Sequence, residues 1–303
     1  MPEKFLIVIA GPTAIGKTKL SIKLAKHLNT AIINADSRQV YKELNIGTAK
    51  PSLSELSEAK HFLVDFLPLD ITYNAGQFEK DALQILDFLF KTKNMVIVSG
   101  GSGLYIKALC EGMDDIPQVP GHFREDLNRF YAQHGITPLL KELTEKDPEY
   151  FEYVDKSNTN RVIRALEIIR GTGKKFSSFR NDKKKTRDFT IIKIGLERNR
   201  EELYELINQR MDLMIAKGLV NEAFSLKAFK NCNALQTVGY REIYDYFEGR
   251  YNWEEAVRLL KRNSRRYAKR QMTWFKGDKE YQWFNPENFE EILDFIRRKT
   301  GNN

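Results

Sequence analysis

The chain has 303 residues, about twice the length of a typical domain, so we expect two modules or one domain that carries a large insertion. It is 42% hydrophobic and 30% charged, a balance that excludes a membrane protein and a mostly disordered chain. The net charge of +8 is modest, so its distribution along the chain is more informative than its size.

The two cysteines and the first residues both indicate a reducing compartment. Cys110 and Cys232 lie far apart and form no CxxC pattern, which argues against a disulfide framework and a structural zinc site. The apolar run at 5–10 is too short for a signal-peptide core or a membrane-spanning helix. We therefore expect a cytoplasmic protein that has no membrane partner.

The first hundred residues alternate apolar, β-branched runs with helix-like stretches. Residues 20–28 and the stretch that begins at Phe78 have helical periodicity. Four apolar runs predict strands, of which the third is the weakest: 5–10, 31–35, 61–66 and 95–99. Strands that alternate with helices indicate a parallel sheet with helices on both faces.

After Met113 the pattern changes to a proline-rich stretch and then to helices only, until strand character returns at 189–194. A long helix from about Arg200 to Gly218 and further helices follow. We therefore expect an α/β fold with a P-loop NTPase-like core, in which helices flank a parallel sheet and an all-helical domain is inserted. The expected boundaries are 1–117 for the first part of the core, 118–188 for the insertion and 189–303 for the rest of the core with its basic C-terminal helices.

Residues 11–18, GPTAIGKT, match the phosphate-binding pattern G-x-x-x-x-G-K-[ST]. The match lies between a predicted strand and an amphipathic helix, which is the context that this motif requires. Backbone N–H groups of such a loop bind phosphate oxygens, Lys17 adds a positive charge, and the Thr18 hydroxyl can ligate Mg²⁺. The loop indicates a phosphate group but no particular reaction, and a purely structural turn is the alternative.

Polar residues follow two other predicted strands. Asp36 comes directly after the strand at 31–35, and in open α/β sheets ligands bind beyond the carboxyl ends of strands. Asp36, Ser37 and Gln39 would therefore project toward the phosphate loop, although Asp36 could instead cap a helix. The glycine-rich turn at 99–105 follows a third strand at the same edge, but such turns are common after strands.

Arg210 lies within an apolar helical stripe that also contains Leu203, Ile207 and Met214. An arginine directed at a core is rare unless an anion pairs with it, and the fork of the guanidinium suits a phosphate or a carboxylate. Two interpretations are open at this point, a bound phosphate ligand and a buried carboxylate of the protein itself.

Positive charge is concentrated in two stretches. Residues 256–276 contain eight lysines and arginines and no acid, and residues 171–190 have a local excess of five positive charges. One predicted helical face in the first stretch carries Arg258, Arg262, Arg265 and Lys269. Like charges at this spacing repel unless an anion lies across them, which favours RNA as a partner over a solvated surface.

Five successive segments resemble signatures of the tRNA dimethylallyltransferase (tRNA isopentenyltransferase) family. They are GPTAIGKT, ADSRQVYKELNIGTAKP, SGGSGLYIKAL, NRVIRALEI and TVGYREI, and they occur in the family's order across nearly the entire chain. The resemblance implies transfer of a dimethylallyl group from dimethylallyl diphosphate to the exocyclic amine of the adenosine immediately 3′ of the anticodon. It also implies Mg²⁺ as cofactor and the anticodon stem-loop of tRNA as partner, and we expect a monomer.

The same resemblance implies roles for individual residues. Asp36 would be the general base, and Lys17, Thr18 and Arg210 would complete the catalytic set, with Thr18 as the metal ligand. The diphosphate-binding residues would be Gly11, Pro12, Thr13, Ala14, Ile15, Gly16, Lys17 and Thr18. The tRNA-binding residues would be Asp36, Ser37, Arg38, Gln39, Ser102, Arg124, Asn160, Arg161, Val162, Ile163, Arg164, Gln236, Thr237, Val238, Gly239, Tyr240 and Arg241. Ser102 replaces the threonine usual in the family and retains its hydroxyl.

These residue types suit the implied chemistry. An aromatic exocyclic amine is a poor nucleophile, so a carboxylate that accepts its proton as the new bond forms assists the reaction. Diphosphate leaves with growing negative charge, which Lys17, Arg210 and the loop amides would stabilise. Because the target base must leave its stack to reach a buried carboxylate, we expect a flipped adenosine.

Three other functions fit parts of the sequence. A P-loop nucleoside or small-molecule kinase would bind ATP in the same loop, but it leaves the basic stretches unexplained. An adenylate isopentenyltransferase would prenylate a free nucleotide, and the long insertion and the basic C-terminal helix argue against it. A non-catalytic RNA-binding protein would not need Lys17, Thr18 and Asp36 together.

Overall fold

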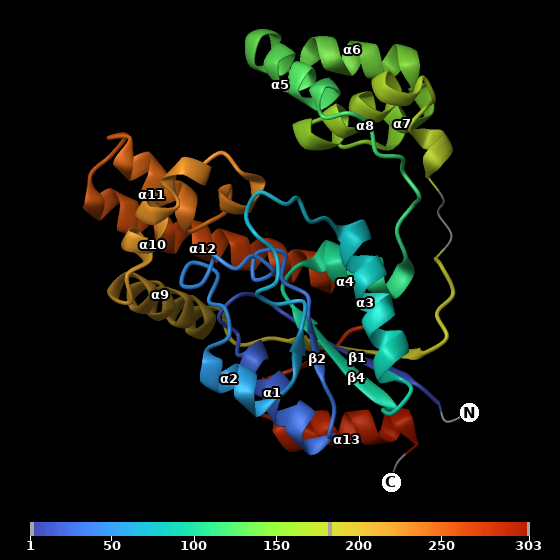
Figure 1. Ribbon diagram of the computed structural model, residues 1–303, viewed down its shortest axis with the longest axis vertical. Coiled ribbons are helices and arrows are strands. Elements are labelled where there is room, and N and C mark those ends of the chain that lie inside the picture. The colour runs from blue at the N-terminus through green and yellow to red at the C-terminus, as the bar shows by residue number, and fades with distance from the viewer. Residues whose placement is uncertain (1–2, 181–183, 302–303) are drawn as a thin grey trace. The chain divides into compact units, whose positions relative to one another are not determined.

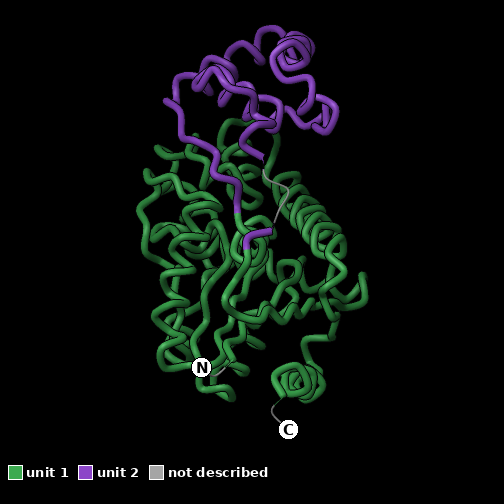
Figure 2. Tube along the Cα trace, turned by 90° about the vertical axis from the view of Figure 1, so that its right-hand side faces the viewer, with its two compact units in different colours: residues 1–112, 186–303 green, residues 113–185 purple. Residues whose placement is uncertain are grey.

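The computed structural model describes residues 3–180 and 184–301 and divides the chain into two compact units (Figure 2). The core unit comprises Met1–Gly112 and Thr186–Asn303, and the helical unit comprises Met113–Lys185. The helical unit thus begins five residues earlier and ends three residues earlier than the expected range of 118–188, because the proline-rich stretch after Met113 belongs to it.

The core unit is built on a six-stranded sheet in which every neighbouring pair is parallel (Figure 1). The strand order is β3-β2-β4-β1-β5-β6. In chain order the strands are β1 (Phe5–Ala10), β2 (Ile32–Asn34), β3 (His61–Phe62), β4 (Met95–Gly100), β5 (Thr190–Leu196) and β6 (Gln282–Phe284). The predicted parallel sheet is therefore confirmed.

Two edge strands differ from the prediction. β3 has two residues instead of six, because Leu63 and Asp65 adopt left-handed φ angles of 58° and end the extended conformation. β6 lies in the C-terminal part of the chain, for which we expected helices only. Its three residues are too few to show the alternating pattern of a strand in the sequence.

Helices cover both faces of the sheet. On one face, Phe5, Ile7 and Ile9 of β1 belong to a core cluster with residues of α1, α9 and α13, while the alternate residues Leu6 and Val8 are also fully buried. The helices of the core unit are α1 (Lys17–His27), α2 (Leu53–Glu58), α3 (Ala75–Leu89), α4 (Gly103–Glu111), α9 (Arg200–Ala216), α10 (Leu219–Ser225), α11 (Tyr240–Phe247), α12 (Trp253–Lys276) and α13 (Phe289–Thr300). Within the described ranges, no helix is long and apolar enough to cross a membrane.

The helical unit has a core of its own, to which Leu127, Leu143, Val162 and Leu166 contribute fully buried side chains. Its helices are α5 (His122–His134), α6 (Thr137–Lys146), α7 (Pro148–Tyr153) and α8 (Thr159–Thr172). Asp147 is completely buried and caps α7, since its Oδ1 accepts a hydrogen bond from the Tyr150 N–H. A separate core explains why this unit can be inserted into the α/β fold.

Candidate active site

The glycine-rich loop connects β1 to α1 and adopts left-handed backbone at Ala14 (φ 65°) and Gly16 (φ 106°). Within the described residues, the backbone N–H groups from Ala14 to Lys19 donate no hydrogen bond. The Ile15 side chain is buried in the core cluster below, which leaves its amide in the loop. Unpaired amides at a helix N-terminus are groups that can bind an anion, so the loop has the donors that a phosphate site would need.

The Lys17 ammonium closes this loop on itself. Its Nζ donates to the carbonyl oxygens of Gly11 (3.0 Å) and Pro12 (2.7 Å). Burial, followed by the charge of Arg210, lowers the pKa of Lys17 to about 7, although Asp36 acts in the opposite direction. Near neutral pH the lysine is therefore poised to take up a proton when an anion binds beside it.

When inorganic diphosphate binds at pH 8, the wild-type protein is expected to take up about 0.9 proton more than Lys17→Met. A lysine of pKa about 7 is mostly neutral at this pH, and an adjacent anion makes it take up a proton. At pH 6 the difference should shrink to about 0.1 proton, since Lys17 is already charged. Calorimetry at saturating diphosphate in two buffers of different ionisation enthalpy measures both values. Equal uptake by the two proteins at pH 8 would mean that Lys17 is already charged in the free protein or does not face the anion.

Asp36 lies directly beyond β2, and its two carboxylate oxygens have different surroundings. Oδ1 accepts hydrogen bonds from the backbone N–H groups of Arg38 (2.8 Å) and Gln39 (3.3 Å). Oδ2 has no hydrogen-bond partner in the part of the chain that the structure describes. Asp36 therefore caps a turn and not a helix, which was the structural alternative, and its other oxygen is left to accept a proton.

Arg210 projects from α9 and is half-buried. It makes no ion pair or hydrogen bond with the residues described, so the expected alternative of a buried carboxylate partner is not found among them. Burial lowers its pKa, while the charges of Asp36 and then Glu55 raise it. The guanidinium thus shares an electrostatic environment with Asp36 and Lys17 and is left without a direct protein partner.

Ser102 connects two edges of the site. Its Oγ accepts a hydrogen bond from the Ser37 N–H (2.9 Å) and so fixes the turn after β4 to the segment after β2. Gly100 makes this close approach possible, because a Cβ there would lie 2.0 Å from the carbonyl oxygen of Ala35. The segments that follow β2 and β4 therefore meet at the carboxyl ends of the strands, and the loop after β1 begins at the same ends, because β1 is parallel to its neighbour β4.

Two predicted tRNA-binding residues instead support the loop at 45–49. Gln39 is buried, and its Nε2 donates to the carbonyl oxygens of Thr48 (3.0 Å) and Ala49 (3.1 Å). Tyr240 is completely buried, and its hydroxyl donates to Glu222 (2.6 Å). Both side chains act on the conformation of this loop.

Glu222, on α10, is a central residue that no pattern in the sequence indicates. Its carboxylate accepts hydrogen bonds from the N–H groups of Asn45, Ile46 and Gly47 as well as from Tyr240. A carboxylate with four donors is strongly fixed. The residue is identifiable only from the fold, because more than 170 residues separate it from the loop that it holds.

The remaining predicted tRNA-binding residues of the core unit follow η3 (Asn233–Leu235). Gln236 and Arg241 are exposed, Thr237 and Val238 are half-buried, and Gly239 is buried. Gly239 has a φ of 107°, a conformation that favours glycine, and precedes α11. Gln236 and Arg241 are therefore the exposed side chains of this segment, although Gln236 Nε2 also donates to the carbonyl oxygen of Lys230 (2.6 Å).

In the helical unit, the predicted tRNA-binding residues divide into core and surface. Val162 and Ile163 are buried in the unit's own core, whereas Asn160 and Arg161 are exposed. Arg124 and Arg164 both pair with the buried Glu167, at 3.0 Å and 3.1 Å. Because two guanidinium groups share one carboxylate, this cluster keeps a net positive charge on the surface.

The basic helix α12 presents a row of cations that have no carboxylate partner among the described residues: Arg262, Arg266, Lys269 and Arg270. Arg258 is different, because it pairs with Glu255 at 2.6 Å, and Arg265 donates to the side chain of Asn208. Of the predicted charged face, Arg262 and Lys269 thus have no carboxylate partner among the described residues, whereas Arg258 and Arg265 interact with other side chains of the protein.

The second basic stretch, 171–190, is also partly compensated. Arg187 forms a buried ion pair with Glu79 (2.8 Å), and Lys185 lies 3.6 Å from Asp115. Residues 181–183 of this stretch lie outside the described residues. Part of its charge therefore stabilises the protein itself.

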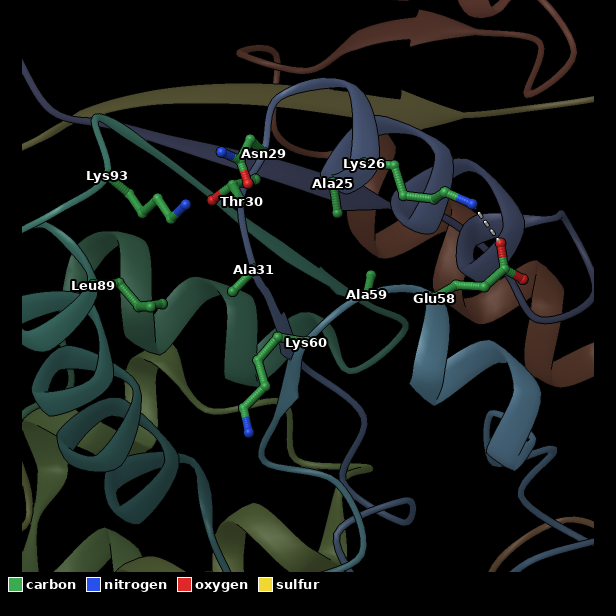
Figure 3. A pocket seen from close by; sticks show the side chains of 10 residues that line it. All are labelled: Ala25, Lys26, Asn29, Thr30, Ala31, Glu58, Ala59, Lys60, Leu89 and Lys93. Carbon is green, nitrogen blue, oxygen red and sulfur yellow. Dashed lines mark hydrogen bonds and ion pairs between the residues drawn. The ribbon is translucent and has the colours of Figure 1, made fainter.

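A cleft of about 360 Å³ lies at the amino ends of the strands, near the beginnings of β2 and β4 (Figure 3). It is lined by Lys26, Thr30, Lys60 and Lys93 among others, and Lys26 pairs there with Glu58. None of the residues predicted for catalysis lines it. The residues that carry the chemistry meet instead at the carboxyl edge, as expected for this class of sheet.

Comparisons with known proteins identify the family of the chain. Residues 39–278 match the family described as IPP transferase. The chain is 52% identical over 297 residues to a tRNA dimethylallyltransferase of Cytophaga hutchinsonii, with 98% of each chain covered, and 50% identical to one of Christiangramia forsetii, with 99% covered. A solved tRNA isopentenylpyrophosphate transferase from Bacillus halodurans is 36% identical, has a TM-score of 0.73, and is matched over 99% of this chain and 97% of that one.

A solved eukaryotic dimethylallyltransferase, described as acting on tRNA, is 27% identical with a TM-score of 0.76, over 93% of this chain and 74% of that one. The relatives extend over nearly the full length of the chain, so the match includes both the core unit and the helical unit. The chain therefore belongs to the tRNA dimethylallyltransferase family, the IPP transferases.

Proposed function

We propose that this enzyme transfers the dimethylallyl group of dimethylallyl diphosphate to the exocyclic amine of the adenosine immediately 3′ of the anticodon in tRNA, giving isopentenyladenosine. The observation that carries the proposal is the meeting of an anion-binding loop, a free carboxylate oxygen of Asp36 and the unpaired Arg210 at one edge of the sheet. We further propose that it acts as a monomer in the cytoplasm, where its two free cysteines would stay reduced.

The donor is bound by its diphosphate. The loop amides after Thr13, the Lys17 ammonium and the Arg210 guanidinium offer hydrogen bonds and positive charge to the leaving group. As the bond from the dimethylallyl carbon to the diphosphate oxygen breaks, negative charge grows on that oxygen. These fixed groups stabilise the growing charge more than that of the bound substrate, which lowers the barrier.

Thr18 is the residue that would hold Mg²⁺. Its hydroxyl lies at the first turn of α1 and has no hydrogen-bond partner among the described residues. No group of three or more His, Cys, Asp or Glu side chains in the described ranges could form a metal cage, which suits a cation bound mainly by phosphate and water. When bound, Mg²⁺ would supply further charge neutralisation to the diphosphate.

Asp36 acts on the acceptor. The amine nitrogen forms a bond to the dimethylallyl carbon, the diphosphate leaves with the electron pair of the broken bond, and Oδ2 of Asp36 accepts the proton that the amine loses. Oδ1 keeps its two backbone hydrogen bonds, which hold the carboxylate in place. Because this site lies beyond the sheet, the target adenosine must be flipped out of its stack.

The tRNA is held by polar and basic residues that are exposed or half-buried. We assign direct contacts to Asn160, Arg161, Arg124, Arg164, Gln236, Arg241 and the unpaired cations of α12. Ser37, Arg38, Thr237 and Val238 are half-buried near the loops of the site and would line the adenosine position. Val162, Ile163, Gln39, Gly239 and Tyr240 would contribute by supporting these surfaces, since they are buried.

The proposal is tested by incubating the enzyme with Mg²⁺, unmodified tRNA and dimethylallyl diphosphate that is radiolabelled in its dimethylallyl group. Parallel reactions contain ATP or AMP. The label should enter tRNA and not AMP, and ATP should be neither required nor consumed. Transfer of the γ-phosphoryl group from ATP would instead identify a P-loop kinase, and labelled AMP would identify an adenylate isopentenyltransferase.

The unpaired cations of α12 should account for much of the salt dependence of tRNA binding. Changing Arg262, Arg266, Lys269 and Arg270 together to glutamine should flatten the slope of log affinity against log salt. The change should be about 0.7 to 0.9 for each phosphate that is no longer neutralised, and so about 3.6 at most. Glutamine keeps the helix propensity, so the change separates charge from folding.

Arg258→Gln is the matched control, because its guanidinium is already paired with Glu255 on the same helix. Filter binding at four salt concentrations should give this variant the wild-type slope. An unchanged slope in the fourfold variant, with lowered thermal stability, would mean that these residues interact with the protein itself and would remove α12 from the tRNA surface.

A further inference from the structure

Gln271 lies on the buried side of α12 and reaches two loops of the active site at once. Its side chain is 7% exposed. Oε1 accepts a hydrogen bond from the Thr13 N–H (2.9 Å), and Nε2 donates to the carbonyl oxygen of Gly101 (2.9 Å). The carboxamide therefore joins the phosphate loop to the turn after β4, although Gln271 is remote from both in the sequence.

The peptide between Pro12 and Thr13 is fixed on both sides. Its carbonyl oxygen accepts a hydrogen bond from Lys17 Nζ, and its N–H donates to Gln271. From Thr13 to Lys19, the Thr13 N–H is the single backbone donor that has a partner among the residues described. Gln271 therefore determines where the free amides of the loop begin.

A rotation of this peptide would change the groups that surround an anion in the loop. The Pro12 carbonyl oxygen, which repels phosphate, would turn away from Lys17, and the lysine would lose one of its two fixed acceptors. Ala14 follows immediately in a left-handed conformation that few non-glycine residues adopt without support. The hydrogen bond from Gln271 holds the loop against such a change.

We propose that Gln271 is a positioning residue for the prenyl donor: its carboxamide fixes the Pro12–Thr13 peptide so that Lys17 and the amides from Ala14 onward face the diphosphate. The inference rests on the proposed function, because it concerns the same donor site. It assigns no contact between Gln271 and substrate. Its expected signature is a weakened affinity for the donor with little change in the affinity for tRNA.

Gly101 offers a way to displace this carboxamide without altering Gln271. A Cβ added at Gly101 would lie 2.3 Å from Gln271 Nε2, while its next neighbours, Gln271 Cδ at 3.5 Å and the Gly11 carbonyl oxygen at 3.7 Å, are at ordinary distances. Gly101 does not have a positive φ, so alanine can adopt its backbone conformation. Gly101→Ala should therefore act through Gln271, and the added methyl group should be tolerated once Gln271 is shortened to alanine.

A double-mutant cycle with Gly101→Ala and Gln271→Ala tests this dependence. Each single change should raise the KM for dimethylallyl diphosphate and the Kd for inorganic diphosphate about tenfold, because the loop loses a fixed hydrogen bond and leaves a buried donor unpaired. The KM for dimethylallyl diphosphate and the Kd for inorganic diphosphate of the double variant should be no higher than those of Gln271→Ala alone. The Kd for tRNA should change less than about twofold in all of them, since the charged face of α12 is unaltered.

Multiplicative effects, about a hundredfold in the double variant, would overturn the proposal, because the two residues would then act independently. A wild-type KM and a wild-type Kd in Gln271→Ala would also overturn it. If Gly101→Ala does not fold, Gln271→Met, which keeps the volume and removes both hydrogen bonds, must still weaken diphosphate binding. Thr273→Ala is the control on the same helix, since among the described residues its hydroxyl bonds to the helix carbonyl of Lys269 and to no other group.

The calorimetric Kd for inorganic diphosphate separates this proposal from the proposed function. If the wild-type enzyme transferred no prenyl group to tRNA, the proposed reaction would fail, yet the cycle in diphosphate affinity would still report on Gln271. If transfer occurred and the effects of the two changes on diphosphate affinity multiplied, Gly101 and Gln271 would act independently, the proposal for Gln271 would fail and the proposed reaction would stand.

Discussion

Asp36→Asn is expected to lower the rate of dimethylallyl transfer at saturating substrates by about a hundredfold or more, with little change in tRNA affinity. Asparagine keeps an oxygen that can accept the hydrogen bonds from the Arg38 and Gln39 amides, so the turn after β2 should remain intact. It replaces the other oxygen with an amide nitrogen that cannot accept a proton. Single-turnover measurements with labelled donor isolate the chemical step.

Asp36→Ala provides the comparison that separates the two roles of this carboxylate. Alanine removes the cap as well as the base, so it should also lower the free energy of unfolding by about 1 kcal/mol, which the asparagine variant should not do. Chemical denaturation of both variants measures this difference. Normal turnover by Asp36→Asn would reduce Asp36 to a structural cap and leave the acceptor without an assigned base.

The central strands and the phosphate loop could be predicted from the sequence because their signals are local. A strand buried on both faces reads as a continuous apolar run, as Phe5–Ala10 does, and the loop follows it at fixed spacing. The edge strands β3 and β6 could not be predicted in the same way. They are two and three residues long, so backbone pairing with a neighbouring strand defines them more than side-chain pattern does.

The supporting residues of the site could not be predicted, for a different physical reason. Gln271 and Glu222 act by hydrogen bonds to backbone groups that lie 170 residues or more away in the sequence. A glutamine in a basic helix and a glutamate in a short helix are ordinary in composition. Only the fold brings them to the loops that they hold.

Family signatures in the sequence likewise do not distinguish residues that touch a substrate from residues that support those contacts. Tyr240 belongs to a signature segment, yet it is completely buried and holds Glu222 in place. Val162 and Ile163 lie in a similar segment and fill the core of the helical unit, between the exposed Arg161 and the half-buried Arg164. Helical periodicity separates these two kinds of residue once the helix is known.

Arg210→Met is expected to lower transfer by about a hundredfold or more while leaving the free energy of unfolding unchanged or raising it by about 1 kcal/mol. The free enzyme keeps this half-buried cation without a protein partner among the described residues, and burial disfavours its charge and so lowers its pKa. Methionine removes that cost and preserves most of the side-chain volume. The effect on transfer arises because the leaving diphosphate loses a positive charge that is already in place.

Arg187→Met is the matched control, since Arg187 forms a buried ion pair with Glu79 in the same unit, with side chains 9% and 8% exposed. Breaking a buried pair should lower the free energy of unfolding by about 3 to 5 kcal/mol, the opposite of the expected result for Arg210. Inorganic diphosphate should also raise the melting temperature of the wild-type protein more than that of Arg210→Met, because the ligand stabilises the fold in proportion to its affinity. Two results would contradict this expectation: a loss of stability in Arg210→Met as large as that in Arg187→Met, and equal stabilisation of wild type and Arg210→Met by diphosphate. Together they would give Arg210 a structural role and leave Lys17 and the loop amides as the groups that bind the donor.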